Sequence, residues 1–166
     1  MQDIEQIKSR LKAQLKPERY IHTLGVADTA RKLAISHGAD PEKAYLAGLL
    51  HDCAKPYADN LSHAAMGAEL AMRDYGVTDT EILDAIRYHT TGRAGMSLLE
   101  KIIYISDFIE PSRAGYEGLD WCRKLAPAEL DKAVALCAKL SLDYLRRKGA
   151  VIDEATVEAY NYYSDL

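Results

Sequence analysis

The residues Ala44-Tyr-Leu-Ala-Gly-Leu-Leu50 form the longest apolar run in the chain, and His51-Asp52 follows directly. Asp40-Pro41 precedes the run as an N-cap residue followed by proline at the first helical position, which predicts a helix over about residues 41–53. Because the second half of this helix is apolar on every side, we expect it to be central and buried. The run is far shorter than the roughly 20 apolar residues that span a bilayer.

Helical patterns and helix boundaries continue on both sides of this run, whereas strand patterns are nearly missing from the sequence. Apolar residues recur at helical spacing, and capping residues, prolines and glycines separate the segments. Helices are expected over residues 3–15, 17–37, 62–75, 80–89, 97–109, around Trp121, over 127–148, and from 153 onward. Ser62 and Thr80 are the expected N-caps of two of them, Ser97 with Glu100 forms a capping box, and Trp121 is expected to anchor its segment in the core.

The length and the helical patterns predict one all-α domain over residues 1–166, with a core of about 17–125 on which C-terminal helices over 127–163 pack. A chain of 166 residues is close to the roughly 150 residues of one domain. The net charge of −4 does not suit binding to a nucleic-acid backbone. The polar N-terminus lacks a signal-peptide pattern, and three widely spaced cysteines without a C-x-x-C motif favour a reducing cytoplasm. We therefore expect a cytoplasmic protein without nucleic-acid or membrane partners.

Ionisable residues stand in three segments that are otherwise apolar: His22, His51-Asp52 and Asp107. A buried charge without a partner costs several kcal/mol, so these groups need a cation or strong hydrogen-bond donors. Histidine and carboxylate groups that converge from separate helices are a common way to bind a divalent metal in an all-α core. Imidazole suits iron, zinc, nickel or cobalt, and added carboxylates make iron(II) or manganese suitable.

Each of these residues also has a purely structural interpretation. A single buried histidine is more often a hydrogen-bonded core residue than a ligand. Asp52 can cap a turn, and Asp107 can pair with Lys101, Arg113 or Arg87. Lys55 can be a solvent-facing cation at a helix end. His22, His51-Asp52 and Asp107 together, in this order, favour the metal site over a set of separate structural roles.

The pattern His22…His51-Asp52…Asp107 resembles the HD-domain superfamily of metal-dependent phosphohydrolases, which are all-α helical bundles. Longer segments resemble the YqeK family of symmetrical bis(5′-nucleosyl)-tetraphosphatases over roughly residues 17–160. These segments are His22-Thr-Leu-Gly-Val-Ala27, Ala47-Gly-Leu-Leu-His-Asp-Cys-Ala-Lys55, Tyr88-His-Thr-Thr-Gly92 and Leu99-Glu-Lys-Ile-Ile-Tyr-Ile-Ser-Asp-Phe-Ile-Glu-Pro111. Cys53 departs from the larger residue, such as tyrosine, that the family pattern favours.

The resemblance implies a site residue by residue. The metal ligands are His22, His51, Asp52 and Asp107, and the metal is iron, with manganese, cobalt, nickel and zinc as alternatives. A second metal at Asp52, His63 and His89 is left open, as is a phosphate contact by His63. The resemblance assigns catalytic roles to four residues and substrate contacts to a larger set. The catalytic residues are Asp52, Lys55, His89 and Arg113; the substrate-binding residues are His22, Asp52, Cys53, Ala54, Lys55, His63, His89, Asp107 and Arg113.

The implied activity is hydrolysis of diadenosine tetraphosphate to two ADP. Lys55 can meet a phosphate as a point charge, and the planar guanidinium of Arg113 matches phosphate oxygens. Alternatives are another HD-type phosphohydrolase, acting on a nucleoside monophosphate, a deoxynucleoside triphosphate or a cyclic dinucleotide, and a nucleotide-sensing module without turnover. The expected partners are a dinucleoside polyphosphate and ADP, and the oligomeric state is left open, with a homodimer as one alternative.

Overall fold

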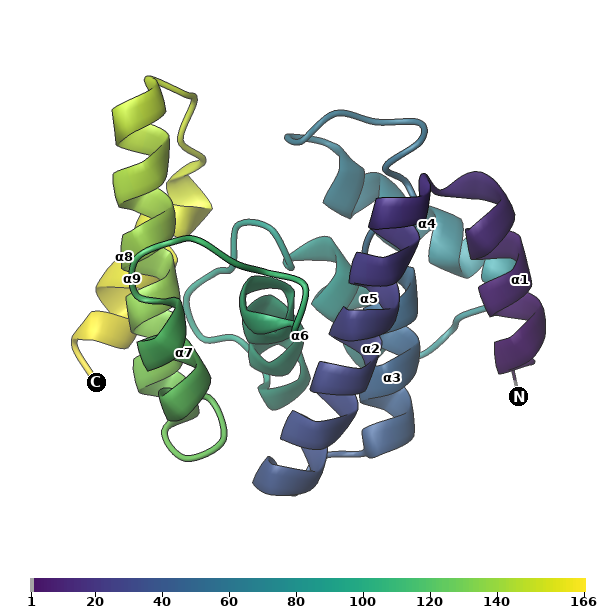
Figure 1. The fold of residues 1–166 in the computed structure, drawn as a ribbon, viewed down its shortest axis with the longest axis horizontal. Coiled ribbons are helices and arrows are strands. Elements are labelled where there is room, and N and C mark those ends of the chain that lie inside the picture. Colours follow the sequence, from purple (N-terminus) through teal and green to yellow (C-terminus); the bar gives the residue numbers. More distant parts are fainter. Residues whose placement is uncertain (1) are drawn as a thin grey trace.

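The computed structural model describes residues 2–166, and within that range it is all-α, as predicted, with nine helices and no strand (Figure 1). The helices are bounded as follows: α1 Ile4–Gln14, α2 Pro17–His37, α3 Pro41–Leu50, α4 His63–Tyr75, α5 Thr80–Arg87, α6 Leu98–Ile109, α7 Leu119–Leu125, α8 Leu130–Lys148 and α9 Glu154–Ser164. Over the same range, no helix is both long enough and apolar enough to cross a membrane.

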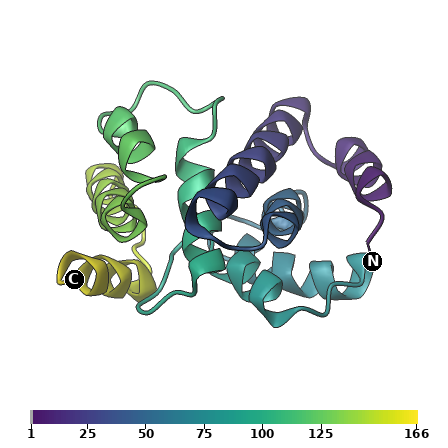
Figure 2. The same ribbon diagram turned by 90° about the horizontal axis from the view of Figure 1, so that it is seen from below.

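Helix α6 lies at the centre of the molecule and contacts α2, α3, α5, α7 and α8. Figures 1 and 2 show it between the α2–α3 pair on one side and the α7–α9 group on the other. Its apolar residues from Ile102 to Ile105 are fully buried, which explains why a segment this hydrophobic occupies the middle of the fold. Asp107, two residues further along, is therefore held in a buried helix rather than in a loop.

Helices α2 and α3 approach unusually closely, because Gly48 of α3 faces the backbone of α2. A Cβ atom on Gly48 would lie 2.7 Å from the Cα of Ala27, which is well inside van der Waals contact. The expected central helix is buried from Ala44 to Leu50. This close contact brings the end of α3, and with it His51-Asp52, against the face of α2 that carries His22.

Some predicted helix boundaries are wrong by a few residues. The α3 helix ends at Leu50, so that residues 51–57 form turns, and α5 ends at Arg87 rather than near residue 89. Asp79, not Thr80, caps α5 by accepting a hydrogen bond from the backbone of Glu81. Helix α8 begins at Leu130 instead of 127, because residues 126–128 form a turn closed by the bond from Glu129 N to Leu125 O.

The predicted capping box at α6 is only half formed. Ser97 Oγ accepts a hydrogen bond from the backbone N–H of Glu100 as predicted. The carboxylate of Glu100, however, is buried and accepts two hydrogen bonds from Arg93, at 2.9 and 2.7 Å. A bidentate arginine contact is stronger than the return bond to an exposed helix end, so the tertiary pair replaces the local one.

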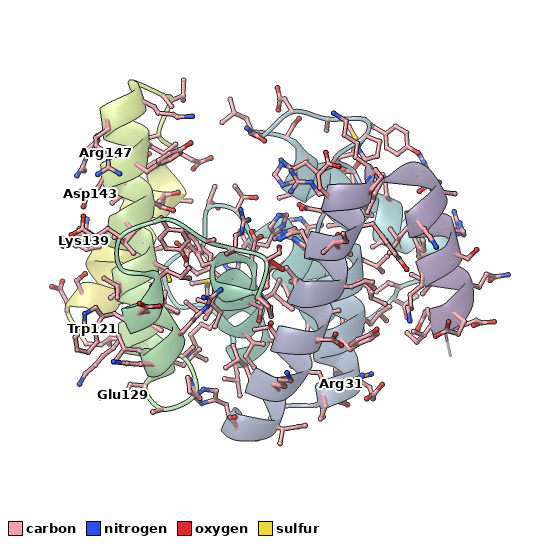
Figure 3. The ribbon with its side chains drawn as sticks, in the orientation of Figure 1. Arg31, Trp121, Glu129, Lys139, Asp143 and Arg147 are labelled. Atoms are coloured by element: carbon pink, nitrogen blue, oxygen red, sulfur yellow. The ribbon has the colours of Figure 1, made fainter. Side chains whose placement is uncertain are left out.

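The expected core anchor at Trp121 is wrong: this side chain is 64% exposed and points outward from α7 (Figure 3). Lys139, Asp143 and Arg147 mark the solvent-facing side of α8 in the same view. The C-terminal aromatic anchor is Tyr163 of α9, which is buried and whose hydroxyl accepts a hydrogen bond of 2.7 Å from the backbone N–H of Met96.

Candidate functional site

His51 and Asp52 lie directly beyond the C-terminus of α3, in the turn that interrupts it. Cys53 N donates to Leu50 O and Lys55 N donates to Asp52 O, so the chain continues in tight turns instead of a helix. Neither His51 nor Asp52 is more than 2% exposed. The turn therefore places an imidazole and a carboxylate side by side in the interior, facing α2 and α6.

The four residues predicted as metal ligands converge there from three separate parts of the chain. His22 Nε2 lies 2.9 Å from Asp107 Oδ1 and 3.7 Å from Asp52 Oδ2. His51 Nε2 lies 3.3 Å from Asp52 Oδ2 and 3.7 Å from Asp107 Oδ1. The structure thus brings together two imidazoles and two carboxylates, as the sequence predicts.

The other oxygen of Asp52 faces a second pair of histidines. His63 Nε2, from the first turn of α4, and His89 Nε2, just beyond α5, each lie 3.3 Å from Asp52 Oδ1. The two nitrogens are 3.1 Å apart. Asp52 therefore lies between two histidine pairs, one at each carboxylate oxygen. The rings of His22, His51, His89 and His63 form a continuous row with edge-to-face neighbours 4.9–5.3 Å apart.

Three of these histidines are oriented by backbone carbonyl groups. The Nδ1 atom of His51 bonds to Gly48 O at 2.7 Å, that of His89 to Ile86 O at 2.7 Å, and that of His63 to Asp59 O at 3.1 Å. A carbonyl oxygen only accepts, so each Nδ1 carries the proton and each Nε2 is available towards Asp52.

The electrostatics of the cluster favour a positive charge at its centre. Burial alone would lower the pKa of His51, but the carboxylates of Asp52 and Asp107 raise it to about 10. Burial would raise the pKa of the Asp52 carboxyl group, yet His51 and the neighbouring histidines hold it well below its usual value. The pKa of Asp107 is likewise held well below its usual value, against burial, by His22 and His51.

The donor set fits a divalent metal ion. Among residues 2–166, the Nε2 atoms of His22 and His51 are buried without a hydrogen-bond partner. One atom from each of His22, His51 and Asp107 lies within 4.8 Å of the others, and the same holds for His51, Asp52 and His89. Unpartnered imidazole nitrogens that face carboxylate oxygens are the ligand types that first-row transition metals bind.

Cationic side chains help to line a cavity of about 130 Å³ that includes part of the cluster. Its lining combines the acidic and imidazole groups with three cations and two neutral polar side chains: Arg19, Asp52, Lys55, Asn60, His63, His89, Thr90, Asp107 and Arg113. Arg113 Nη2 donates to Asp107 Oδ1 at 3.1 Å, and Lys55 Nζ donates to Asn60 Oδ1 at 2.6 Å. Burial lowers the pKa of Lys55, and Asp52 partly opposes this.

Cys53 and Ala54, predicted to contact substrate, are both buried beside Asp52. The thiol of Cys53 donates to Gly67 O, and burial raises its pKa to about 12. Any substrate contact at these two positions therefore falls to the main chain.

The sequence interpretation missed Arg19 and Asn60, and also Glu110, whose Oε1 lies 3.7 Å from His22 Nδ1. Arg19 Nη1 donates to Asp52 Oδ2 at 3.0 Å. Its position three residues before His22 places both side chains on one face of α2, which is a signal that could have revealed it. Asn60 and Glu110 have no comparable local pattern, because their partners are set by packing between distant segments.

This fold and this arrangement of histidine and aspartate residues define an HD-domain protein, and residues 19–112 match the family model described as HD domain. The chain is 41% identical to the symmetrical bis(5′-nucleosyl)-tetraphosphatase of Bacillus subtilis, over 95% of this chain and 96% of that protein. It is 38% identical to the protein of the same name from Halalkalibacterium halodurans, over 91% of each. The chain belongs to this family of symmetrical bis(5′-nucleosyl)-tetraphosphatases.

A solved structure supports the HD-domain assignment. A Clostridium acetobutylicum protein described as a predicted HD superfamily hydrolase involved in NAD metabolism superposes with a TM-score of 0.93. The two chains are 39% identical, and the match covers 99% of this chain and 98% of the other.

Proposed function

We propose that this protein is a metal-dependent phosphohydrolase that cleaves diadenosine tetraphosphate symmetrically to two ADP. The observation that carries the proposal is a cavity in which a buried histidine–aspartate cluster adjoins three cations, Arg19, Lys55 and Arg113. The relatives at 38–41% identity bear the name of that activity.

His22, His51, Asp52 and Asp107 are the residues that would hold the metal. When bound, a divalent metal polarises a phosphoryl oxygen and lowers the pKa of a water molecule, which makes that water nucleophilic near neutral pH. Iron is the metal we propose, with manganese, cobalt, nickel and zinc as alternatives. A second ion at Asp52, His63 and His89 is a further proposal, supported by the two nitrogens that face Asp52 Oδ1.

The cations and His89 would bind the substrate's phosphates. Lys55 and Arg113 neutralise the charge that develops on the transferred phosphoryl group and on the departing ADP. His89 Nε2 and Thr90 Oγ1 lie 3.1 Å apart and offer polar contacts on the same side of the cavity. Arg19 adds a third positive charge beside Asp52, so that phosphates on either side of the reacting phosphorus have a cationic partner.

The arrangement favours the inner bridge of the tetraphosphate. Cations at several points of the cavity rim can hold phosphates on both sides of the bond that breaks, and only an inner phosphorus has phosphate on both sides. Hydrolysis there adds one water, breaks one phosphorus–oxygen bond, forms another, and leaves two ADP. Cleavage at the outermost phosphorus would leave one of these binding positions facing a ribose.

We also propose that residues 1–166 act as one domain, in the cytoplasm, without nucleic-acid or membrane partners. Helix α6 carries Asp107 and contacts both the α2–α3 pair and α8, which supports a single folding unit. A homodimer is retained as the oligomeric proposal.

Quenched time points separated by anion-exchange chromatography test the function. We expect ADP as the sole product from diadenosine tetraphosphate, slower cleavage of the triphosphate analogue, and poor hydrolysis of ATP. Equal amounts of ATP and AMP from the first time point contradict symmetrical cleavage. Faster turnover of a monophosphate, a deoxynucleoside triphosphate or a cyclic dinucleotide favours another HD-type activity, and binding without turnover favours a sensing role.

Matched variants separate the metal ligands from the phosphate-binding residues. His51→Ala and Asp52→Ala should lose metal and activity while keeping a helical circular-dichroism spectrum. Lys55→Ala and Arg113→Ala should keep the metal but lose about ten- to a hundredfold in turnover, since a charge-assisted contact contributes about 1.5–3 kcal/mol. Lys139→Ala, on the outer side of α8 (Figure 3), is the control and should match the unsubstituted protein.

A further inference from the structure

We propose that Glu110 is the positioning residue for His22: its buried carboxylate sets which nitrogen of that imidazole faces the metal site. The inference rests on the metal site of the proposed function and adds to it a residue that contacts neither substrate nor metal.

His22 is oriented differently from its three neighbours. The Nδ1 atoms of His51, His63 and His89 each bond to a backbone carbonyl oxygen. The Nδ1 atom of His22 instead faces a carboxylate, with Glu110 Oε1 at 3.7 Å. All four rings therefore turn Nδ1 away from the cluster, but only His22 has a full negative charge behind it.

Glu110 is buried to an unusual degree for a carboxylate. Its exposed fraction is 0%, and its Oε2 atom has no hydrogen-bond partner among residues 2–166. Oε1 accepts a hydrogen bond from Ser112 Oγ. A buried carboxylate with an unsatisfied oxygen is costly unless a positive group or a polarised N–H lies close by, and His22 supplies that group.

The backbone around Glu110 is held in place by Arg123. The guanidinium of Arg123 donates to the carbonyl oxygens of Ile109, Glu110 and Arg113 at 2.9–3.0 Å. The segment that follows α6 is thereby tied to α7, and the carboxylate is presented from a fixed main chain. This is the arrangement expected of a group that orients another side chain.

Gly25 provides the space that the carboxylate occupies. It lies three residues after His22 on α2, hence on the same helix face. A Cβ atom at this position would lie 2.2 Å from Glu110 Oε2 and 3.1 Å from its Cδ. Glycine in the middle of a helix is unfavourable relative to alanine, so the position is explained by the carboxylate that packs against it.

The Glu110 carboxylate should make His22 a stronger metal ligand. A carboxylate behind an imidazole favours the proton on Nδ1, leaves the Nε2 lone pair free, and makes that nitrogen a stronger donor to a metal. At 3.7 Å the contact is longer than a hydrogen bond, so the carboxylate acts on the ring chiefly through its charge in a low-dielectric interior. Loss of that charge should weaken metal binding without removing a ligand.

The test is a titration of the metal-free protein with Co²⁺, followed by its visible absorption bands. Glu110→Gln keeps the size and a hydrogen-bond acceptor but removes the charge, and should weaken Co²⁺ binding about 10- to 100-fold and shift the absorption bands at saturation. Gly25→Ala leaves the carboxylate intact but displaces it, and should give the same phenotype. The double variant Gly25→Ala/Glu110→Ala should bind Co²⁺ no more weakly than Glu110→Ala alone, because the added methyl group then has no carboxylate to displace.

Glu100→Gln is the matched control. Glu100 is the other buried glutamate of this region, at 3% exposure, and it pairs with Arg93 instead of a metal-site histidine. Its substitution should lower thermal stability and leave the Co²⁺ affinity and spectrum unchanged. The inference is overturned if Glu110→Gln binds Co²⁺ as the unsubstituted protein does, or if Glu100→Gln weakens binding equally. If the unsubstituted protein binds no divalent metal, the metal site of the proposed function fails as well.

Discussion

Replacing Gly48 by alanine should damage both stability and activity, because this glycine sets the distance between the two helices that form the site. The added Cβ would lie 2.7 Å from Ala27 Cα and 3.0 Å from Ala27 N. Carbon atoms prefer about 3.5–4.0 Å, so the helices must separate by about 1 Å. Overpacking of this kind lowers the free energy of unfolding by about 1–3 kcal/mol. The higher helix propensity of alanine offsets about 1 kcal/mol of this loss.

We therefore expect the free energy of unfolding to fall by up to about 2 kcal/mol, by urea denaturation followed by circular dichroism. The larger effect should be on turnover, because the separation moves His22 away from His51 and Asp52, and a 1 Å displacement at a reacting centre can cost about a hundredfold. Gly67→Ala, also in a helix, is the comparison: its Cβ would lie 3.3 Å from Ile86 Cγ2 and 3.5 Å from His51 O, so it demands far less displacement than a Cβ 2.7 Å from a backbone Cα. A Gly48→Ala protein with unchanged stability and turnover would refute this reasoning.

Three further predictions concern charge and anchoring. In the metal-free protein the pKa of His51 is raised to about 10, so protonated His51 contributes fully to the free energy of unfolding below pH 6.5, and this contribution is lost as the pH rises towards 10. Urea denaturation with a chelator should therefore show a lower free energy of unfolding at pH 8.5 than at pH 7, and His51→Gln should make that difference smaller. Tyr163→Phe leaves the buried Met96 N–H without its acceptor and should lower stability by about 1–3 kcal/mol, with metal affinity unchanged; an equal melting temperature would contradict it. Arg19→Ala should raise KM more than it lowers metal affinity, and the reverse result would place Arg19 with the metal ligands.

Much of the helical framework and the identity of the central site residues could be inferred from the sequence. Helix boundaries depend on residues that are adjacent in the sequence, such as Asp40-Pro41 at the start of α3 and Gly38 after α2. They can therefore be predicted from the sequence alone. The pattern of His22, His51-Asp52 and Asp107 was detectable for a related reason. Ionisable residues in apolar helices stand out without any knowledge of how the helices pack.

Side-chain partners across distant elements could not be inferred, because they depend on which helix faces meet after packing. Glu100 follows the local capping rule in its sequence, yet Arg93 takes its carboxylate. Trp121 has the size of a core residue, yet α7 turns it towards solvent. The contact between Arg19 and Asp52 spans 33 positions in the chain, and it exists because α2 and α3 pack closely at Gly48. Helical periodicity shows which residues share a face, whereas the packing of α2, α3 and α6 sets what that face meets.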